Sequence, residues 1–248
     1  MERISLGFRI LKENLWLGWV ALAFNFFVFF IELITKSLPL VPPGFHLKFA
    51  MPNGIPEMSS ILQQPQVQGI NINLSSIALI ISPFLVGGFL SAIYRLLENK
   101  KTDKEIFIED SKHFFLRLLS INVIIFLLML ASMLLLVFPP LVIVAIIFFV
   151  YLTYFWQLAL VKDDLEILEA LNKGKTVFKN NLSPVLGQMF TVAIISAIVG
   201  VPLNIMGQSV IGYGLAIIIW SFVGIGLSIS IISLYDDLSN EKPPELTL

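Results

Sequence analysis

The sequence predicts an all-α membrane protein with six transmembrane helices arranged as three tandem hairpins. Three observations predict this fold: an unusually apolar composition, six apolar segments of bilayer length, and basic residues gathered on one side of those segments. Of the 248 residues, 57% are hydrophobic and 13% are charged, and the mean hydropathy is +0.89. Soluble domains hold about 25% charged residues. We therefore expect much of the apolar surface to face lipid.

Six segments are long enough to cross a bilayer. The hydrocarbon core is about 30 Å thick and needs roughly 20 apolar residues of helix. The segments that meet this length are residues 15–35, 74–97, 116–137, 141–161, 185–203 and 210–234. The first is longer than the ~7–15-residue core of a cleavable signal peptide, so we interpret it as a permanent span. Pro139 and Pro140 break the third apolar run from the fourth and predict a tight hairpin there.

The basic residues predict the orientation of the chain. All of the 16 Lys and Arg residues except Lys36 and Lys48 fall in the amino-terminal segment, the carboxyl-terminal tail or the loops that share their side of the membrane. Cytoplasmic loops carry the excess of Lys and Arg. We therefore expect both termini in the cytoplasm. Short loops and the lack of a targeting signal favour a prokaryotic plasma membrane.

A short amphipathic segment precedes the first, third and fifth spans, which indicates a repeated unit. Gly7 to Leu15 matches Gly174 to Leu182, since each stretch begins with glycine and ends with Asn-Leu. The middle copy, residues 106–116, keeps the amphipathic pattern without the glycine. We expect one polytopic domain, residues 1–248, with repeat units of about 1–97, 104–161 and 164–235 and a cytoplasmic tail at 236–248. Each amphipathic segment is expected to be a helix in the cytoplasmic interface.

The start of the third amphipathic helix is expected to carry a capping box. Asp163 and Glu166 stand at the N-cap and N3 positions of such a motif, where each side chain accepts from a free backbone amide. The residues that follow recur with helical spacing on one apolar face. This pattern predicts a helix that begins at about residue 164.

Short motifs in both halves of the chain resemble those of a known group of proteins. They are Gly87-Gly88 through Tyr94 with Lys100 and Ile106-Phe107, and Leu160-Val161 into Asp164-Leu165 with Glu169-Ala170-Leu171, Phe178 and Asn181. The pattern resembles uncharacterised prokaryotic six-span membrane proteins that are similar to the membrane domain of some glycerophosphodiester phosphodiesterases. The resemblance implies a six-helix membrane domain and no established activity. The soluble phosphodiesterase domain, with its metal ligands, has no counterpart in these residues.

Residues 36–73 form the long loop on the outer side. Apolar residues alternate with others from Phe45 to Met51 and again from Ile70 to Leu74. Such alternation predicts a small β-hairpin. Two interpretations stay open: an ordered lid or plain connector, and a surface that touches a partner, a peptide or a substrate entrance.

Polar residues inside the spans are candidate functional positions because burying them in lipid is costly. The candidates are Asn25, Glu32, Asn122 and Gln157. Hydrogen bonds between helices are the simpler explanation for the three amides. For Glu32, an ion pair with Lys36 near the outer headgroups is the simpler explanation.

An acidic group is predicted at the cytoplasmic ends of the spans. It consists of Asp163, Asp164, Glu166, Glu169, Asp236 and Asp237. These carboxylates could rim a vestibule or bind a divalent cation, although helix capping and solvation explain them more simply. His46 and His113 fall on opposite sides of the membrane, so they cannot share a metal ion.

Small residues at helical spacing in the second and sixth spans predict close approach between helices. They are Gly87, Gly88, Ser91, Gly224, Gly226, Ser228 and Ser230. Packing within one protomer is the simpler interpretation, and a transporter hinge or a dimer face is the alternative.

Composition and the absence of known motifs exclude several classes of function. The absence of cysteine excludes disulfides, thiolate catalysis and Cys-based metal sites, and no phosphate loop or dinucleotide fingerprint occurs. A net charge of −1 argues against nucleic acid. We expect no catalytic residue, cofactor or metal, and a non-enzymatic accessory or scaffold protein whose partners are the lipid bilayer and another membrane protein or a second copy. The alternatives are a small-solute or peptide transporter or permease subunit, and an immunity or membrane-stress protein that acts through the outer loop.

Overall fold

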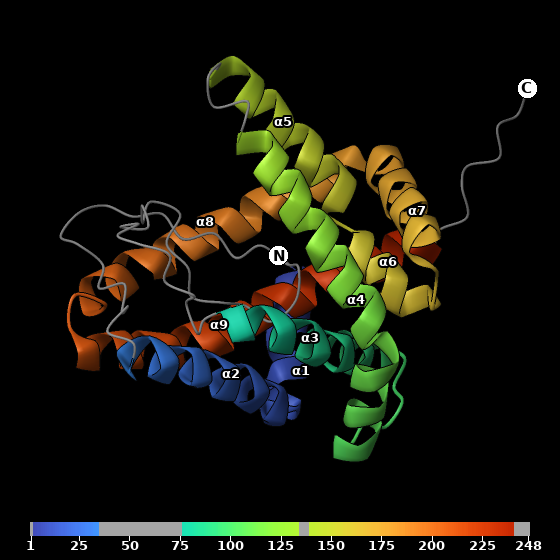
Figure 1. The fold of residues 1–248 in the computed structure, drawn as a ribbon. Coiled ribbons are helices and arrows are strands. Elements are labelled where there is room, and N and C mark those ends of the chain that lie inside the picture. The colour runs from blue at the N-terminus through green and yellow to red at the C-terminus, as the bar shows by residue number, and fades with distance from the viewer. Residues whose placement is uncertain (1, 35–75, 134–138, 241–248) are drawn as a thin grey trace, which may run out of the picture. The chain divides into compact units, whose positions relative to one another are not determined.

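A computed structural model describes residues 2–34, 76–133 and 139–240 (Figure 1). Within these ranges every regular element is an α-helix and no strand occurs. The all-α prediction is therefore confirmed for the described chain. The predicted β-hairpin and the outer loop at 36–73 lie outside the described residues. The structure therefore does not test the immunity hypothesis, which depends on that loop.

The helices begin and end close to the predicted apolar segments. They are α1 Glu2–Glu13, α2 Leu15–Ile34, α3 Ser76–Leu97, α4 Lys104–Met133, α5 Pro139–Thr153, α6 Trp156–Asp163, α7 Ile167–Asn180, α8 Leu182–Met206 and α9 Val210–Asn240. In a long apolar segment surrounded by lipid, the backbone N–H groups can bond only to carbonyls of the same segment. This requirement favours a helix.

Several of these helices could cross a membrane. Three pass a test of length and apolar composition: α4 over Lys104–Leu128, α8 and α9. The pair α1 and α2, bent by 87° at its break, passes as a fourth. Residues Ile81–Leu97 of α3 form a shorter apolar helix. The length and composition of these helices therefore support a membrane protein with several spans.

The predicted fourth span is broken into two helices. Residues 141–161 were expected to form one helix, but α5 ends at Thr153 and α6 begins at Trp156. No proline or glycine lies at the break. Instead, the rings of Tyr154 and Phe155 pack against Phe178 of α7, at 5.8 and 6.1 Å between centroids. Tertiary packing of aromatic side chains accompanies this break.

The predicted capping box at residues 163–166 is wrong. Asp163 is the last residue of α6, and Asp164 adopts a left-handed conformation with φ 49° and ψ 44° that ends that helix. Helix α7 begins at Ile167 with Glu166 as its N-cap residue, and the Glu166 side chain makes no capping hydrogen bond. The carboxylate of Asp163 pairs with Lys173 at 2.8 Å instead. An ion pair thus replaces the predicted backbone cap.

The middle amphipathic segment is not a separate helix. Residues 106–116 continue into the apolar part of α4 without a break. The start of α4 is capped by Asp103, whose carboxylate accepts a hydrogen bond of 2.9 Å from the Ile106 amide. Within the described residues, separate amphipathic helices therefore precede α2 and α8 alone, as α1 and α7.

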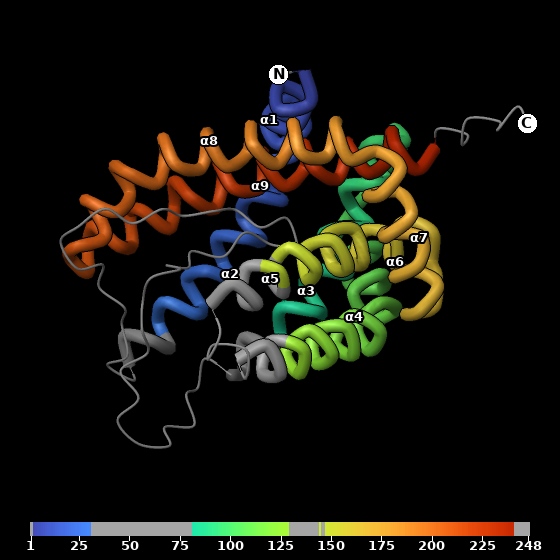
Figure 2. Tube along the Cα trace, turned by 90° about the horizontal axis from the view of Figure 1, so that it is seen from above, coloured from blue at the N-terminus to red at the C-terminus, as the bar shows by residue number. Residues whose placement is uncertain are grey.

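Packing divides the chain into two compact units, residues 1–82 with 186–231 and residues 83–185 with 232–248. In the first unit, Leu22 and Phe29 of α2 form a core with Tyr213 and Ile217 of α9. Figure 2 shows α8 and α9 as neighbouring helices, and they share a second core around Trp220. In the second unit, α7 packs on α5 and α6 through Ala170, Gly174, Val177 and Phe178.

Candidate functional site

Two of the four candidate intramembrane polar residues bond to each other. Gln157 of α6 donates from Nε2 to Oδ1 of Asn122 in α4 at 2.9 Å. The Gln157 side chain is buried, and its Oε1 has no hydrogen-bond partner among the described residues. The Asn122–Gln157 bond therefore links α4 to α6 and leaves the Gln157 Oε1 atom without a partner among the described residues.

The third candidate, Asn25, is paired within the first unit. Its Nδ2 donates to Oγ of Ser221 in α9 at 2.9 Å, and both side chains are buried. A similar bond joins Gln188 of α8 to Ser230 of α9 at 3.0 Å. Sequence reasoning did not single out Gln188, although it is an amide within an apolar helix. The side chain of Glu32 lies outside the described residues.

Part of the predicted acidic group lies among cations at the turn between α6 and α7. Asp164 accepts from Arg117 of α4 at 2.5 Å and lies 2.9 Å from Nε2 of His113. Arg117 also donates to the carbonyl of Leu165 at 2.9 Å. These contacts hold the turn against α4.

The charge of Asp164 is stabilised by this arrangement. Partial desolvation of the carboxyl favours its neutral form, but hydrogen bonds from His113 and Arg117 and the positive guanidinium outweigh that effect. The pKa of Asp164 is consequently lowered below its usual value. Because the side chain is 58% exposed, solvent screens much of this stabilisation.

Two further carboxylates of the acidic group, Asp236 and Asp163, are also paired. Lys162, with a side chain only 10% exposed, lies 2.6 Å from the Asp236 carboxylate and donates to Ser239 at 2.5 Å and to Asn240 at 3.1 Å. Asp163 pairs with Lys173 and accepts from the Tyr235 hydroxyl at 3.5 Å. These bonds tie the end of α9 to α6 and α7 within the second unit.

Three of the acidic residues therefore form separate ion pairs: Asp163 with Lys173, Asp164 with Arg117, and Asp236 with Lys162. Glu166, Glu169 and Asp237 are exposed. No group of three or more His, Cys, Asp or Glu side chains lies close enough to hold a metal ion in the described ranges. The geometry gives Asp163, Asp164 and Asp236 a role in holding helices together.

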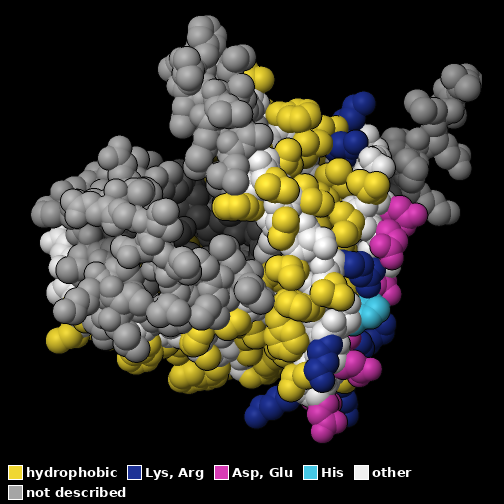
Figure 3. Space-filling view, viewed as in Figure 1, with side chains coloured by type: hydrophobic (Ala, Val, Ile, Leu, Met, Phe, Trp, Pro, Cys, Tyr) yellow, Lys and Arg dark blue, Asp and Glu magenta, His cyan; other side chains and the backbone are white. Residues whose placement is uncertain are grey.

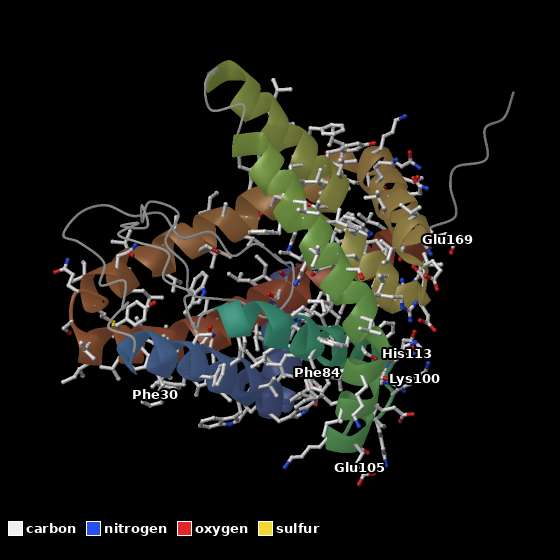
Figure 4. All side chains as sticks on the ribbon, viewed as in Figure 1. Phe30, Phe84, Lys100, Glu105, His113 and Glu169 are labelled. Atoms are coloured by element: carbon white, nitrogen blue, oxygen red, sulfur yellow. The ribbon has the colours of Figure 1, made fainter. Side chains whose placement is uncertain are left out.

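Charged side chains of the second unit form a band along one edge of the face in Figure 3, next to apolar surface. Figure 4 shows Lys100, Glu105, His113 and Glu169 along the same edge. Exposed apolar residues such as Phe126 and Leu127 lie further along α4. This change from charged to apolar surface matches a boundary between water and lipid.

The small residues of α3 lie against α4. A Cβ atom on Gly87 would be 3.0 Å from Cβ of Phe114, and one on Gly88 would be 2.6 Å from the Phe107 carbonyl and closer still to Ser111. Ser91 donates to Asp110 at 2.5 Å. These three residues therefore bring two helices of one protomer together.

Arg95 strengthens the same contact and was missed by sequence reasoning. Its guanidinium donates to both oxygens of Asp110, at 3.1 and 3.3 Å. The side chain of Asp110 is 15% exposed. A signal existed, since Arg95 follows Ser91 by one helical turn and so shares its face, but the partner Asp110 could not be known without the fold.

In α9 the close approach occurs at Gly226, one of the small residues predicted to allow it. A Cβ on Gly7 of α1 would collide with the Gly226 carbonyl, and one on Gly226 would be 2.6 Å from the Phe8 ring. Gly224 is buried. Ser228 is also buried, and its hydroxyl has no hydrogen-bond partner among the described residues.

Comparison with known proteins finds no relative of this chain. No protein-family model matches it, and neither the curated proteins nor the solved structures give a match.

Proposed function

We propose that this chain is a non-enzymatic membrane protein, an accessory or scaffold component of a prokaryotic plasma membrane. The observation that carries the proposal is that the intramembrane amides are paired with polar side chains of other helices, Asn25 with the Ser221 hydroxyl and Asn122 with the Gln157 amide. Amides that bond between helices stabilise packing. Side chains committed in this way are poorly placed to bind a solute.

The proposed topology has six spans with both termini in the cytoplasm. The spans are α2, α3, α4, α5 with α6, α8 and α9, in three successive hairpins. Its support is the agreement between these helices and the predicted apolar segments, together with the distribution of Lys and Arg. The resemblance to six-span prokaryotic membrane proteins points the same way. Helices α1 and α7 would lie in the cytoplasmic interface.

A transporter is the second candidate, and one observation favours it. The hydroxyls of Ser196 in α8 and Ser228 in α9 are buried and have no hydrogen-bond partner in the described part of the chain. Unpaired polar groups within spans often mark a solute path. Under this alternative, both hydroxyls and the free Oε1 of Gln157 would face water-filled space.

Cysteine accessibility in membranes separates the two candidates. The chain has no native cysteine, so single variants can be made directly: Asn25→Cys, Gln157→Cys and Ser228→Cys, with exposed Asn172→Cys as the control. A small charged thiol reagent is added to permeabilised membranes. The scaffold proposal expects reaction at residue 172 and protection at the other three. Reaction at residues 157 and 228 at a rate near that of the control would replace it with the transporter.

A further inference from the structure

Two helix breaks in this chain share one geometry. Asn14 separates α1 from α2, and Asn181 separates α7 from α8. Asn14 donates from Nδ2 to the carbonyl four residues earlier, Ile10, at 3.1 Å, and Asn181 does the same to Val177 at 3.0 Å. Each break therefore closes the last turn of an amphipathic helix and starts an apolar helix at the next residue. We call these two breaks the asparagine elbows.

Each elbow holds its amphipathic helix against the protein through a glycine seven residues before the asparagine. Gly7 lies against the backbone of Gly226, and a Cβ on Gly174 would be 3.0 Å from the backbone of Phe155. The glycine faces of α1 and α7 are buried by these contacts. Charged residues on the opposite faces are left at the surface.

A lysine stands two residues before each asparagine. Lys12 and Lys179 lie in the last turn of α1 and α7, both are exposed, and neither has an ion-pair partner among the described residues. The neighbouring lysine Lys173 differs, because it pairs with Asp163. The two elbow lysines are therefore free to bind an external anion.

Large apolar side chains follow each lysine at the surface. After Lys12, the side chains of Leu15 and Trp19 are 53% and 62% exposed. After Lys179, the side chain of Leu182 is 50% exposed. A cation beside apolar surface matches the two parts of a phospholipid, since the ammonium reaches the phosphate while apolar side chains contact the acyl chains.

We propose that the two asparagine elbows bind anionic phospholipids, with the lipid phosphate held by Lys12 at one elbow and by Lys179 at the other. The inference rests on the proposed function, because it requires the chain to be inserted in a bilayer. A phospholipid fits each elbow better than a free phosphate ion, because the ion would leave the adjoining apolar side chains without a partner. Each lysine near a membrane surface changes the affinity for anionic lipid by up to roughly fivefold.

Lipid selectivity measured by electron spin resonance tests the proposal. The full chain is reconstituted in phosphatidylcholine vesicles that contain spin-labelled phosphatidylglycerol or, separately, spin-labelled phosphatidylcholine. The ratio of the two association constants is measured for the wild type, Lys12→Gln, Lys179→Gln and the double variant. Lys101→Gln is the matched control, since Lys101 is an exposed lysine of the α3–α4 loop and belongs to neither elbow.

We expect the wild type to prefer phosphatidylglycerol, each single variant to lose part of the preference and the double variant to lose most of it, while Lys101→Gln keeps it. A double variant with wild-type preference, or an equal loss in Lys101→Gln, would overturn the lipid site. The same spectra report insertion, because lipids beside an inserted protein show a motionally restricted signal. Absence of that signal for spin-labelled phosphatidylcholine would instead contradict the membrane-spanning proposal itself.

Discussion

The side-chain amide of Asn25 in α2 donates a 2.9 Å hydrogen bond to the hydroxyl of Ser221 in α9, and both groups are buried. Residues 196 positions apart in the sequence thus pair inside an apolar core. Hydrogen bonds between membrane helices contribute on average about 0.6 kcal/mol and at most about 1.7 kcal/mol. This bond is expected to lie in that range.

A double-mutant cycle measures the bond. We expect Asn25→Ala and Ser221→Ala each to lower the free energy of unfolding, with a coupling energy between them of about 0.6–1.7 kcal/mol. Unfolding by SDS from mixed micelles provides the four free energies. Strictly additive losses would show that the two side chains do not interact.

The glycines of α3 are expected to tolerate no added methyl group. A Cβ at residue 88 would be 2.6 Å from a backbone carbonyl of α4, so α3 and α4 would have to move apart. Overpacking of this kind costs about 1–3 kcal/mol, and we expect Gly88→Ala to lower the thermal unfolding midpoint in detergent.

Gly187→Ala in α8 is the matched control for Gly88→Ala. A Cβ at residue 187 meets nothing within 4 Å, and alanine favours helix over glycine by up to about 1 kcal/mol. We expect this variant to be neutral or slightly stabilised. Equal midpoints for the two variants would contradict the close approach of α3 and α4.

Stability is expected to depend on pH through Asp164. Its pKa is lowered in the folded state by His113 and Arg117 against the opposing effect of desolvation. A carboxyl whose folded pKa is depressed stabilises the protein at pH values above its unfolded pKa of about 3.9, and this stabilisation is lost as the pH falls through the lower folded pKa. Because the group is largely exposed, we expect about 0.2–1 kcal/mol after screening.

The variant Asp164→Asn tests this dependence. At neutral pH it is expected to unfold more easily than the wild type, and the difference is expected to shrink in acid, below about pH 4. Unfolding midpoints from pH 3 to 8 provide the comparison. A difference that stays constant over this range would assign the loss to geometry and not to charge.

The positions of most helices followed from the sequence, since apolar length and helix-flanking residues are local signals. The bounds of α2 and α9 agree with their predicted spans to within a few residues. The break between α5 and α6 left no such signal. It lies where Tyr154 and Phe155 meet Phe178 of α7, and that contact exists only in the folded chain.

The polar contacts followed less well for the same reason. Asn25, Asn122 and Gln157 could be named because amides are rare in apolar segments, but their partners depend on which helices pack together. The predicted capping box was wrong because Asp163 is the last residue of α6, and Asp164 follows it in a left-handed conformation. The pairing of Arg95 with Asp110 was not predicted, because charged residues near span ends are common. The two side chains meet only when α3 packs on α4.

The six-span topology is the central claim, and single-cysteine labelling tests it most directly. A membrane-impermeant maleimide is applied to intact spheroplasts that carry Ser59→Cys, Lys101→Cys, Asn172→Cys or Gln208→Cys in the naturally cysteine-free chain. The account predicts labelling at residues 59 and 208 in intact spheroplasts, and at residues 101 and 172 only after permeabilisation. Labelling of residue 101 or 172 from outside, or protection of residue 59 or 208, would contradict it.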